Sequence, residues 1–420
     1  MTSETVSPAQ SLTDLTPGEL QELLQPSTFV SGRLRVLHIG KYFPPFAGGI
    51  EYFLNDLMLA QQEQGLSVAA VVHHHASRHT QYESYRGLPI WRVGTLGRLL
   101  YAPISPDFPR VLRSVVNKFR PDVLHLHLPN PSAFWALTLS RLRDIPWIVH
   151  WHSDVTTNRV GRAVRTAYHL YRPLEQRTLA RADTVITTSP DYLASSAALA
   201  NWRYKCEAVP LGLDPARLVK PAQEILDWAE NLWPQRGLRV LAIGRLTYYK
   251  GHDVLLRAVE RTPGVQLCIV GSGDLQSHLG QMMIELDLRE RVRLVGSLPD
   301  EHVQALLATC DCLCLPSIDR TEAFGIVMLE AMSHAKPIVA SEIPGAGVGW
   351  VARQGGALLV PPEDTHALSE ALATYGDDAR LRQTHGAAGA KAFEEHFQIA
   401  QVTGRLTAIY DRHYMTRQTG

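Results

Sequence analysis

The sequence predicts an α/β protein built from two doubly wound domains, each a mainly parallel sheet covered by helices. Two observations support this fold class. Short apolar runs of strand length alternate with helical patterns along most of the chain. The alternation pauses in a polar, proline-containing connection at 212–237 and restarts at 238. We therefore expect an N-terminal Rossmann-like domain at 33–211 and a C-terminal one at 212–398, which face each other across a cleft.

Composition and charge are those of an ordinary globular enzyme. Apolar residues make up 45% and charged residues 20% of the 420-residue chain. Lysine plus arginine and aspartate plus glutamate both number 41, so no overall positive field favours nucleic acid as a partner. The start of the chain lacks the basic and apolar segments of a signal peptide, and no apolar run is long enough to span a membrane. We expect a cytoplasmic protein with an N-terminal arm at 1–32.

The sequence gives no reason to expect a metal centre. The chain has five cysteines, of which Cys310, Cys312 and Cys314 alternate along an apolar run. Alternation places the three on one face of a strand, where they are expected to be small buried apolar side chains. There is no Asp-x-Asp motif and no cysteine and histidine cluster with zinc spacing.

The first domain is expected to begin with a buried strand at 35–40. A loop containing Gly48 and Gly49 follows, and then a helix at 52–64. Paired glycines between a strand and a helix allow a phosphate or another ligand to approach the backbone closely, although a plain tight turn explains them as well. Further elements of this domain are expected as strands at 67–72, 87–93, 182–189 and 206–210 and a helix at 105–119.

Polar side chains follow two further strands, predicted within 121–131 and 146–154. Because ligands bind outside the carboxyl ends of parallel strands, we expect these side chains to line one crevice and to contact an acceptor substrate. A single histidine whose hydrogen bonds are made within the core would not indicate a site. The four residues together favour a functional role. The residues are His127, Asn130, His152 and Asp154.

A basic amphipathic helix is predicted at 156–181. This segment contains six arginines against a single acid, Glu175, and its apolar residues recur at helical spacing. One interpretation is peripheral contact with anionic lipid headgroups at the inner face of a membrane. The alternative is a helix whose apolar stripe packs on the core and whose arginines are solvated. Pro173 is expected to kink or end the helix.

The second domain repeats the pattern. Strands are expected at 238–244, 265–270, 292–296, 311–316, 337–341 and 357–360. Helices are expected at 252–261, 300–308, from 324, at 363–375 and at 379–397, with a final helix at 399–414.

Three strand-to-helix turns of this domain carry the residues expected to bind an anionic ligand. Arg245 and Lys250 lie between the end of a strand and the start of a helix, where they can clamp a diphosphate, or can simply be solvated. The turns also contain Gly244, Gly271 and Gly273. In the third turn Glu322 and Glu330 flank a predicted helix start, whose first N–H groups lack partners in the helix. The two carboxylates can accept hydrogen bonds from hydroxyl groups on either side of a bound diphosphate. This arrangement is suited to binding a nucleotide sugar.

These motifs resemble a known family. G-R-L-x-x-x-K-G at 244–251, G-S-G-D at 271–274 and E-A-F-G-I-V-M-L-E at 322–330 look like the donor half of family 4 retaining glycosyltransferases with the GT-B fold. The segment at 343–351 departs from the G-G-x-x-E of many members. In this and in K-Y-F-P-P, H-L-P-N-P and W-H-S-D the chain is similar to a bacterial subgroup of rhamnosyl and mannosyl transferases.

The resemblance implies a role for each candidate residue. Arg245 and Lys250 would hold the diphosphate, Glu330 the ribose and Glu322 the transferred sugar. His152 would face the reactive side of the sugar, and the final helix would cross back to the first domain. The backbone of the third turn would meet sugar and phosphate, and the loop of Gly48 and Gly49 would close over the phosphates. The backbone residues are Ala323, Phe324, Gly325 and Ile326.

The expected activity is therefore a metal-independent, retaining glycosyl transfer. The first guess for the donor is GDP-mannose, and the expected acceptor is a glycan or lipid-linked oligosaccharide of surface polysaccharide synthesis. The departing phosphate can take the proton of the acceptor hydroxyl, so no side-chain base is required. Two alternatives stay open on the same fold. One is a sugar phosphorylase, synthase or nucleotide-sugar epimerase, and the other is a non-catalytic partner subunit.

Overall fold

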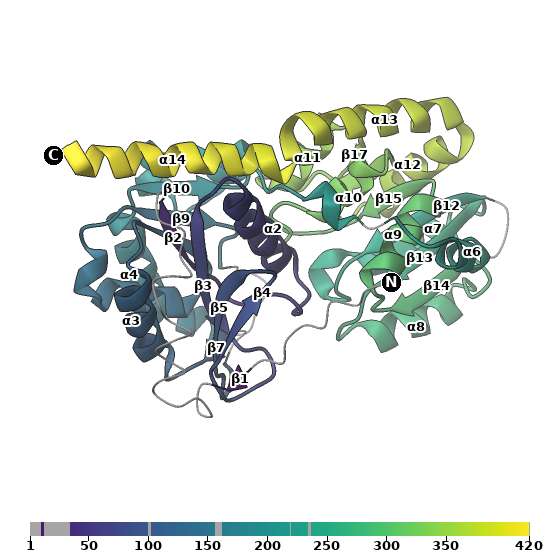
Figure 1. The fold of residues 1–420 in the computed structure, drawn as a ribbon. Coiled ribbons are helices and arrows are strands. Elements are labelled where there is room, and N and C mark those ends of the chain that lie inside the picture. Colours follow the sequence, from purple (N-terminus) through teal and green to yellow (C-terminus); the bar gives the residue numbers. More distant parts are fainter. Residues whose placement is uncertain are drawn as a thin grey trace. The chain divides into compact units, whose positions relative to one another are not determined.

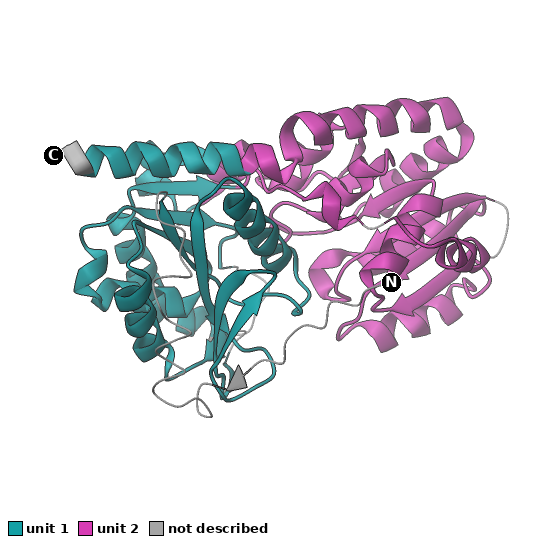
Figure 2. Ribbon diagram, viewed as in Figure 1, with its two compact units in different colours: residues 1–187, 197–209, 403–420 teal, residues 188–196, 210–402 magenta. Residues whose placement is uncertain are grey.

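The computed structural model describes residues 10–11, 34–99, 102–155, 162–218, 220–233 and 237–419. It divides into two compact units (Figure 2). Unit 1 comprises residues 1–187, 197–209 and 403–420, and unit 2 comprises residues 188–196 and 210–402. The expected arm at 1–32 lies outside the described residues except for 10–11, and so does the part of the basic segment at 156–161.

Unit 1 is a nine-stranded sheet in which seven neighbouring strands are parallel and β1 and β4 add an antiparallel edge (Figure 1). Its order is β1-β4-β5-β3-β2-β8-β9-β10-β11, and a separate two-stranded sheet pairs β6 with β7. The strands are β1 Gln10–Ser11, β2 Arg35–Ile39, β3 Ser67–His73, β4 Gln81–Tyr85, β5 Leu88–Val93, β6 Gly97–Leu99, β7 Ala102–Ile104, β8 Val123–Leu128, β9 Trp147–Trp151, β10 Thr184–Thr187 and β11 Cys206–Ala208.

The helices of unit 1 come from three separate stretches of the chain. They include α2 Gly49–Glu63, α3 Phe108–Phe119 and α4 Arg162–Arg181, with 3-10 turns at Pro131–Thr138, Ser140–Leu142 and Ala200–Lys205. The long helix α14, Ile399–Thr419, begins in unit 2 and continues in unit 1. Leu406, Ile409 and Tyr410 on this helix are buried, and His413 bonds the hydroxyl of Thr184 in β10 at 2.6 Å.

Unit 2 is a six-stranded parallel sheet in the order β14-β13-β12-β15-β16-β17. Its strands are β12 Leu238–Ile243, β13 Val265–Val270, β14 Val292–Gly296, β15 Cys312–Leu315, β16 Ile338–Ser341 and β17 Leu358–Val360. Its helices are α5 Pro190–Ser195, α6 Gln223–Leu232, α7 His252–Glu260, α8 Gln276–Glu285, α9 Asp300–Thr309, α10 Val327–Ser333, α11 Gly347–Gln354, α12 Thr365–Asp377 and α13 Ala379–Ala392. The two Rossmann-like units confirm the expected fold class.

Several local features differ from expectation, including helix α6, which lies within the connection expected at 212–237. Helix α10 begins at Val327 rather than near Phe324, because Gly325 has φ = +76° and cannot belong to a right-handed helix. Helix α4 does not end at Pro173 but continues to Arg181, and Glu175, Thr178 and Leu179 beyond the proline are buried. The antiparallel strand β4 was not expected at all. The cysteines of β15 are free and buried, as predicted.

Candidate functional site

A buried ion pair joins two of the expected donor-site residues. Nζ of Lys250 lies 2.5 Å from Oε2 of Glu322, and both side chains are only 12% exposed. Lys250 ends a short 3-10 turn after β12, and Glu322 lies in the loop after β15. Because β12 and β15 are neighbours in the parallel sheet, their carboxyl ends bring the two residues together. The hydroxyl of Ser317 donates to the same carboxylate oxygen at 3.3 Å.

Arg245 extends this charged cluster through a tyrosine. Its Nη2 donates to the hydroxyl of Tyr249 at 3.1 Å. Nζ of Lys250 lies 5.8 Å from the centroid of the same aromatic ring. The loop after β12 thus holds two cations that both contact Tyr249, and one of them pairs with Glu322. The two cations can supply the positive charge that a diphosphate group requires.

The glycine turn at 271–274 packs directly on this loop. Gly271 has φ = +139°, and a Cβ at this position would lie 2.0 Å from the carbonyl oxygen of Gly244. A Cβ at Gly273 would lie 2.4 Å from the carbonyl oxygen of Leu246, whose amide donates to Ser272 at 3.0 Å. These glycines are therefore needed for contact between two loops. Whether they also meet a nucleotide stays a prediction.

The turn before α10 offers the unpaired peptide groups that the sequence predicts. Within the described part of the chain, the amide N–H groups of Phe324, Gly325 and Ile326 have no hydrogen-bond partner. The next two amides are bonded in a tight turn, since Met328 donates to Gly325 and Leu329 to Ile326, both at 2.9 Å. Three unpaired N–H groups a few residues from the ion pair can bind an anion.

Glu330, one turn into α10, is held by a residue that the sequence analysis missed. Its Oε1 lies 3.5 Å from Nη2 of Arg217, which ends the 3-10 turn Pro215–Arg217. The ion pair positions the carboxylate, whose oxygens can accept hydrogen bonds from hydroxyl groups. Arg217 had no sequence signal, because it belongs to the polar connection that we interpreted as a domain boundary.

The loop that carries Glu322 is braced by the segment that departs from the family motif. Arg320 donates to the carbonyl oxygen of Gly345 at 3.2 Å and to Oγ of Ser195 at 2.9 Å. The amide of Gly347 donates to the carbonyl oxygen of Ala323 at 2.8 Å. Residues 345–347 therefore support the position of the 320–323 backbone.

The glycine pair of unit 1 stands at the start of α2. Gly48 is the N-cap residue, and a Cβ there would lie 2.1 Å from Oε2 of Glu51. Gly49 is the first residue of the helix. The nearest atoms belong to the end of the flexible Glu51 side chain, which can move, so packing alone does not require a glycine at this position. A phosphate contact by either glycine stays a prediction.

Five buried histidines share one face of the unit 1 sheet. In the parallel register, His38 of β2 pairs with His125 of β8, and His127 of β8 pairs with His150 of β9. His152 directly follows β9, and residues two apart on a strand point to the same face. Burial lowers the pKa of His38 to about 4 and that of His152 to about 3. It also holds the pKa values of His125, His127 and His150 well below their usual range, so all five rings are neutral at neutral pH.

The expected acceptor-side residues are largely engaged within unit 1. Both ring nitrogens of His127 have partners, Nε2 with His38 at 3.1 Å and Nδ1 with His152 at 3.0 Å. Asn130 is fully buried and donates to the carbonyl oxygen of Gly40 at 2.9 Å. Asp154 accepts a hydrogen bond from the indole of Trp151 at 2.9 Å. The structure thus joins His127 directly to His152, and gives Asn130 and Asp154 structural partners of their own.

Two family models match the chain in succession. Residues 48–212 match a glycosyl transferase 4-like domain, and residues 226–392 match glycosyl transferases group 1. The D-rhamnosyltransferase WbpZ of Pseudomonas aeruginosa is 33% identical over 347 residues, which cover 81% of this chain and 86% of that protein. The chain belongs to the group 1 glycosyltransferases.

Further relatives and solved structures agree with this assignment. The glycosyltransferase is 29% identical to O-antigen chain mannosyltransferase C of Escherichia coli over 90% of its own length and 98% of that protein. A sucrose-phosphate synthase from Thermosynechococcus elongatus has the same GT-B fold, with a TM-score of 0.76, 22% identity and coverage of 91% of this chain and 100% of that one. Among the described residues, no helix combines the length and the apolar character needed to cross a bilayer.

Proposed function

We propose that this glycosyltransferase moves a hexose from a nucleotide sugar to a glycan or lipid-linked acceptor, with retention of anomeric configuration and without a metal ion. The observation that carries the proposal is the cluster of Arg245, Lys250, Glu322 and the three unpaired amides of Phe324, Gly325 and Ile326. It offers positive charge, a carboxylate and N–H donors at neighbouring strand ends of one parallel sheet.

Each part of the cluster has a proposed task. Arg245 and Lys250 bind the diphosphate, and they stabilise the negative charge that develops on it as the bond to the sugar breaks. Glu322 accepts hydrogen bonds from hydroxyl groups of the transferred sugar, and Glu330 from the ribose. The two positive side chains balance the negative charge of the leaving diphosphate. These residues can therefore take the role that a divalent cation has in other transferases.

The relatives support the sugar and the acceptor class. Their names include an O-antigen chain mannosyltransferase, a D-rhamnosyltransferase and a phosphatidyl-myo-inositol mannosyltransferase. Mannose carried by GDP is therefore the proposed donor, and a growing surface glycan or a lipid-linked saccharide is the proposed acceptor. One solved neighbour is a complex with UDP and glucose, so the donor test must include other nucleotides and sugars.

The donor site can be tested with a panel of GDP-, UDP- and ADP-linked hexoses, by following release of the nucleoside diphosphate. We expect turnover with GDP-mannose that is unaffected by EDTA. Lys250→Ala removes a charge from the leaving group and should lower kcat about a hundredfold or more. Glu322→Gln should also impair transfer, because it removes the charged acceptor proposed for hydroxyl groups of the transferred sugar.

A matched pair of residues provides the control. Lys391 and Glu395 form an exposed ion pair in the same unit at 3.8 Å, so Lys391→Ala and Glu395→Gln should leave kcat unchanged. The proposal is wrong if no nucleotide sugar is turned over and none raises the melting temperature of the wild-type protein. A requirement for a divalent cation would contradict the metal-independent chemistry alone.

We also propose that α4 contacts anionic lipid. Arg165, Arg172 and Arg177 are exposed on this helix, and between them Leu170 is 78% and Leu174 39% exposed. Exposed arginines beside exposed leucines suit a headgroup region, where each basic residue contributes about 1 kcal/mol of attraction.

Vesicle co-sedimentation tests the lipid contact. Binding should rise when phosphatidylglycerol is added to phosphatidylcholine vesicles, and should fall when Arg165, Arg172 and Arg177 are changed together to Gln. The control changes three exposed arginines of unit 2 to Gln, namely Arg257, Arg261 and Arg289. Binding that is independent of anionic lipid, or equally weakened by the control, would remove this proposal.

A further inference from the structure

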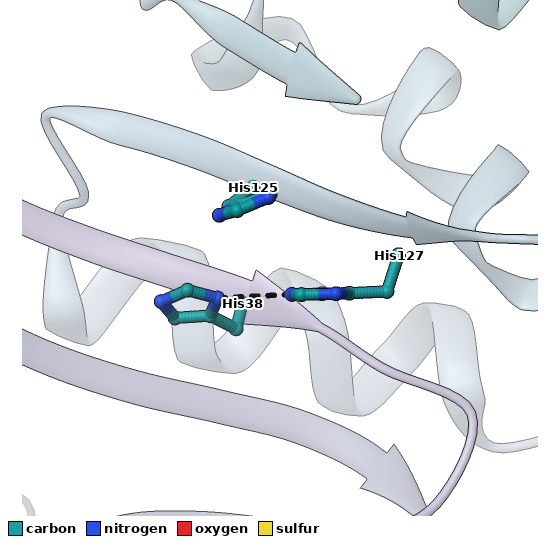
Figure 3. Close-up of side chains that lie close together, drawn as sticks. All are labelled: His38, His125 and His127. Atoms are coloured by element: carbon teal, nitrogen blue, oxygen red, sulfur yellow. Dashed lines mark hydrogen bonds between the residues drawn. The ribbon is translucent and has the colours of Figure 1, made fainter. Parts of the chain in front are cut away.

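A chain of hydrogen bonds runs through the buried histidines of unit 1 and ends at His152. Nε2 of His152 bonds Nδ1 of His127 at 3.0 Å, and Nε2 of His127 bonds Nδ1 of His38 at 3.1 Å, as Figure 3 shows for the second contact. Nε2 of His38 bonds Oε1 of Gln61 at 2.8 Å. This series of hydrogen bonds therefore links β2, β8 and the residue after β9 to helix α2.

The series of hydrogen bonds continues to α14, the last helix of the molecule. Nε2 of Gln61 donates to the hydroxyl of Tyr410 on α14 at 3.0 Å. That hydroxyl lies 2.6 Å from Nδ1 of His125. All six residues are buried, with side chains from β2, β8, α2, α14 and the residue that follows β9.

Because the imidazole rings are neutral, the hydrogen bonds of this series can all run from donor to acceptor in only one of two directions. A neutral ring carries one N–H, so a ring that accepts at one nitrogen must donate at the other. The Gln61 amide selects the direction, since its nitrogen donates to Tyr410 and its carbonyl oxygen must then accept from His38 Nε2–H. His38 Nδ1 in turn accepts from His127 Nε2–H, and His127 Nδ1 accepts from His152 Nε2–H.

We propose that Gln61 and Tyr410, acting through His38 and His127, fix His152 as the Nε2–H tautomer and leave its Nδ1 as a hydrogen-bond acceptor. Nδ1 of His152 is buried and has no partner among the described residues, so its lone pair is available. Gln61 and Tyr410 are positioning residues in this scheme. The consequence for catalysis rests on the proposed glycosyl transfer and on the expectation that His152 faces the reactive side of the transferred sugar, where Nδ1 would accept a hydrogen bond from a sugar hydroxyl.

Metal binding is the competing use of the same rings. Nitrogens of His38, His125 and His127, and those of His127, His150 and His152, lie within 4.8 Å of one another. The rings of His127 and His152 are within 13° of parallel and share an edge-to-edge hydrogen bond. Those of His150 and His152 are stacked at 4.4 Å and 3°. In the set that contains His152, nearly parallel planes do not direct three lone pairs at one point. In the set that contains His125, the rings are tilted by 21° to 39°, but both ring nitrogens of His38 and of His127 are engaged in hydrogen bonds, so the geometry favours the hydrogen-bonded chain.

Nuclear magnetic resonance of the full-length chain labelled with ¹⁵N-histidine tests the proposal without any substrate. Long-range proton–nitrogen spectra report which ring nitrogen carries the proton, and the His152 signals are assigned by their loss in His152→Gln. We expect the Nε2–H tautomer at His152 in the wild type. Tyr410→Phe leaves the Gln61 NH₂ group without an acceptor. The amide should then turn and donate to His38, and His152 should change to the Nδ1–H tautomer.

The matched control is Tyr375→Phe, which removes another buried tyrosine hydroxyl bonded to a histidine, Nδ1 of His385 at 2.8 Å. It should leave the His152 tautomer and kcat unchanged, whereas Tyr410→Phe should lower kcat about tenfold, the equivalent of one hydrogen bond. The Nδ1–H form in the wild type, an unchanged tautomer in folded Tyr410→Phe, or Zn²⁺ binding that shifts these ring signals would overturn the inference. A changed tautomer with unchanged kcat would instead refute the role of His152 in the proposed function.

Discussion

Glu175 in α4 makes the stability of the chain depend on pH. Burial raises the pKa of this carboxyl group from 4.5 to about 7, against the opposing effect of a hydrogen bond from the hydroxyl of Tyr168 at 3.2 Å. Between these two values the folded chain keeps a proton that the unfolded chain releases. The contribution of Glu175 to the free energy of unfolding is therefore fully present below about pH 4.5 and is lost as the pH rises through about 7.

The prediction concerns the neutral variant Glu175→Gln. Its melting temperature should exceed that of the wild type at about pH 8 and approach it at about pH 5, because the amide never ionises. A pKa difference of this size corresponds to roughly 3 kcal/mol. Exposed Glu290 gives the control variant Glu290→Gln, which should show no such trend. A melting difference that does not vary with pH would contradict the assignment to Glu175.

At the level of single residues, the sequence located the charged donor cluster and missed its supports. Lys250 and Glu322 were expected together because both follow strands of one parallel sheet, and they form an ion pair. Arg217 and Tyr249 carry no motif, and their contacts depend on how two loops fold. The histidine chain had a signal that we used only in part: His125, His127, His150 and His152 alternate on adjacent strands, so one face of the sheet collects them.

Among the secondary-structure elements, α12 shows how one side chain starts a helix. Oδ1 of Asp364, the N-cap residue, accepts hydrogen bonds from the amides of His366 at 3.0 Å and Ala367 at 2.9 Å. These amides would otherwise lack partners, because a helix start leaves its first N–H groups unpaired.

Asp364→Ala should therefore destabilise unit 2 by about 1 kcal/mol, and Asp364→Ser should recover most of the loss. The measurement is urea unfolding followed by circular dichroism, with glycosyl transfer assayed in parallel. Activity should be unaffected, since the cap has no contact with the donor cluster. Equal losses in both variants would mean that the cap does not act through its side-chain oxygen.

The elements that the sequence did not predict have physical explanations. Strand β4 is joined to β5 by Arg86 and Gly87, with φ = 52° and 84°. Two positive φ angles define a hairpin turn that usually begins with Asn or Asp, so an arginine gave no signal. The late start of α10 follows from Gly325, whose φ of +76° lies outside the right-handed helical region. A Cβ at this position would lie 2.6 Å from Cδ2 of Leu315, so the turn has no room for a side chain. Most of the parallel strands were predictable because they are short, buried, apolar runs, such as β3, β13 and β15.

For the whole molecule, the composition of unit 1 leads to a truncation experiment. Unit 1 needs the segment 403–420, which contributes the buried side chains of Leu406, Ile409 and Tyr410. A chain that ends after residue 402 should expose the apolar surface under α14 and lose the bond between Tyr410 and His125. We expect unit 1 to become sensitive to limited proteolysis while unit 2 stays resistant. Equal resistance of both units would show that α14 is dispensable for unit 1.

The same feature sets an order of events during biosynthesis. A ribosome delivers the chain from its N-terminus, and domains generally fold as units once their residues have emerged. Residues 1–187 emerge first, yet their unit is complete only after 403–420 has been translated, later than all of unit 2. The sheet of unit 1 therefore waits through the synthesis of all of unit 2 before Tyr410 can bond Gln61 and His125.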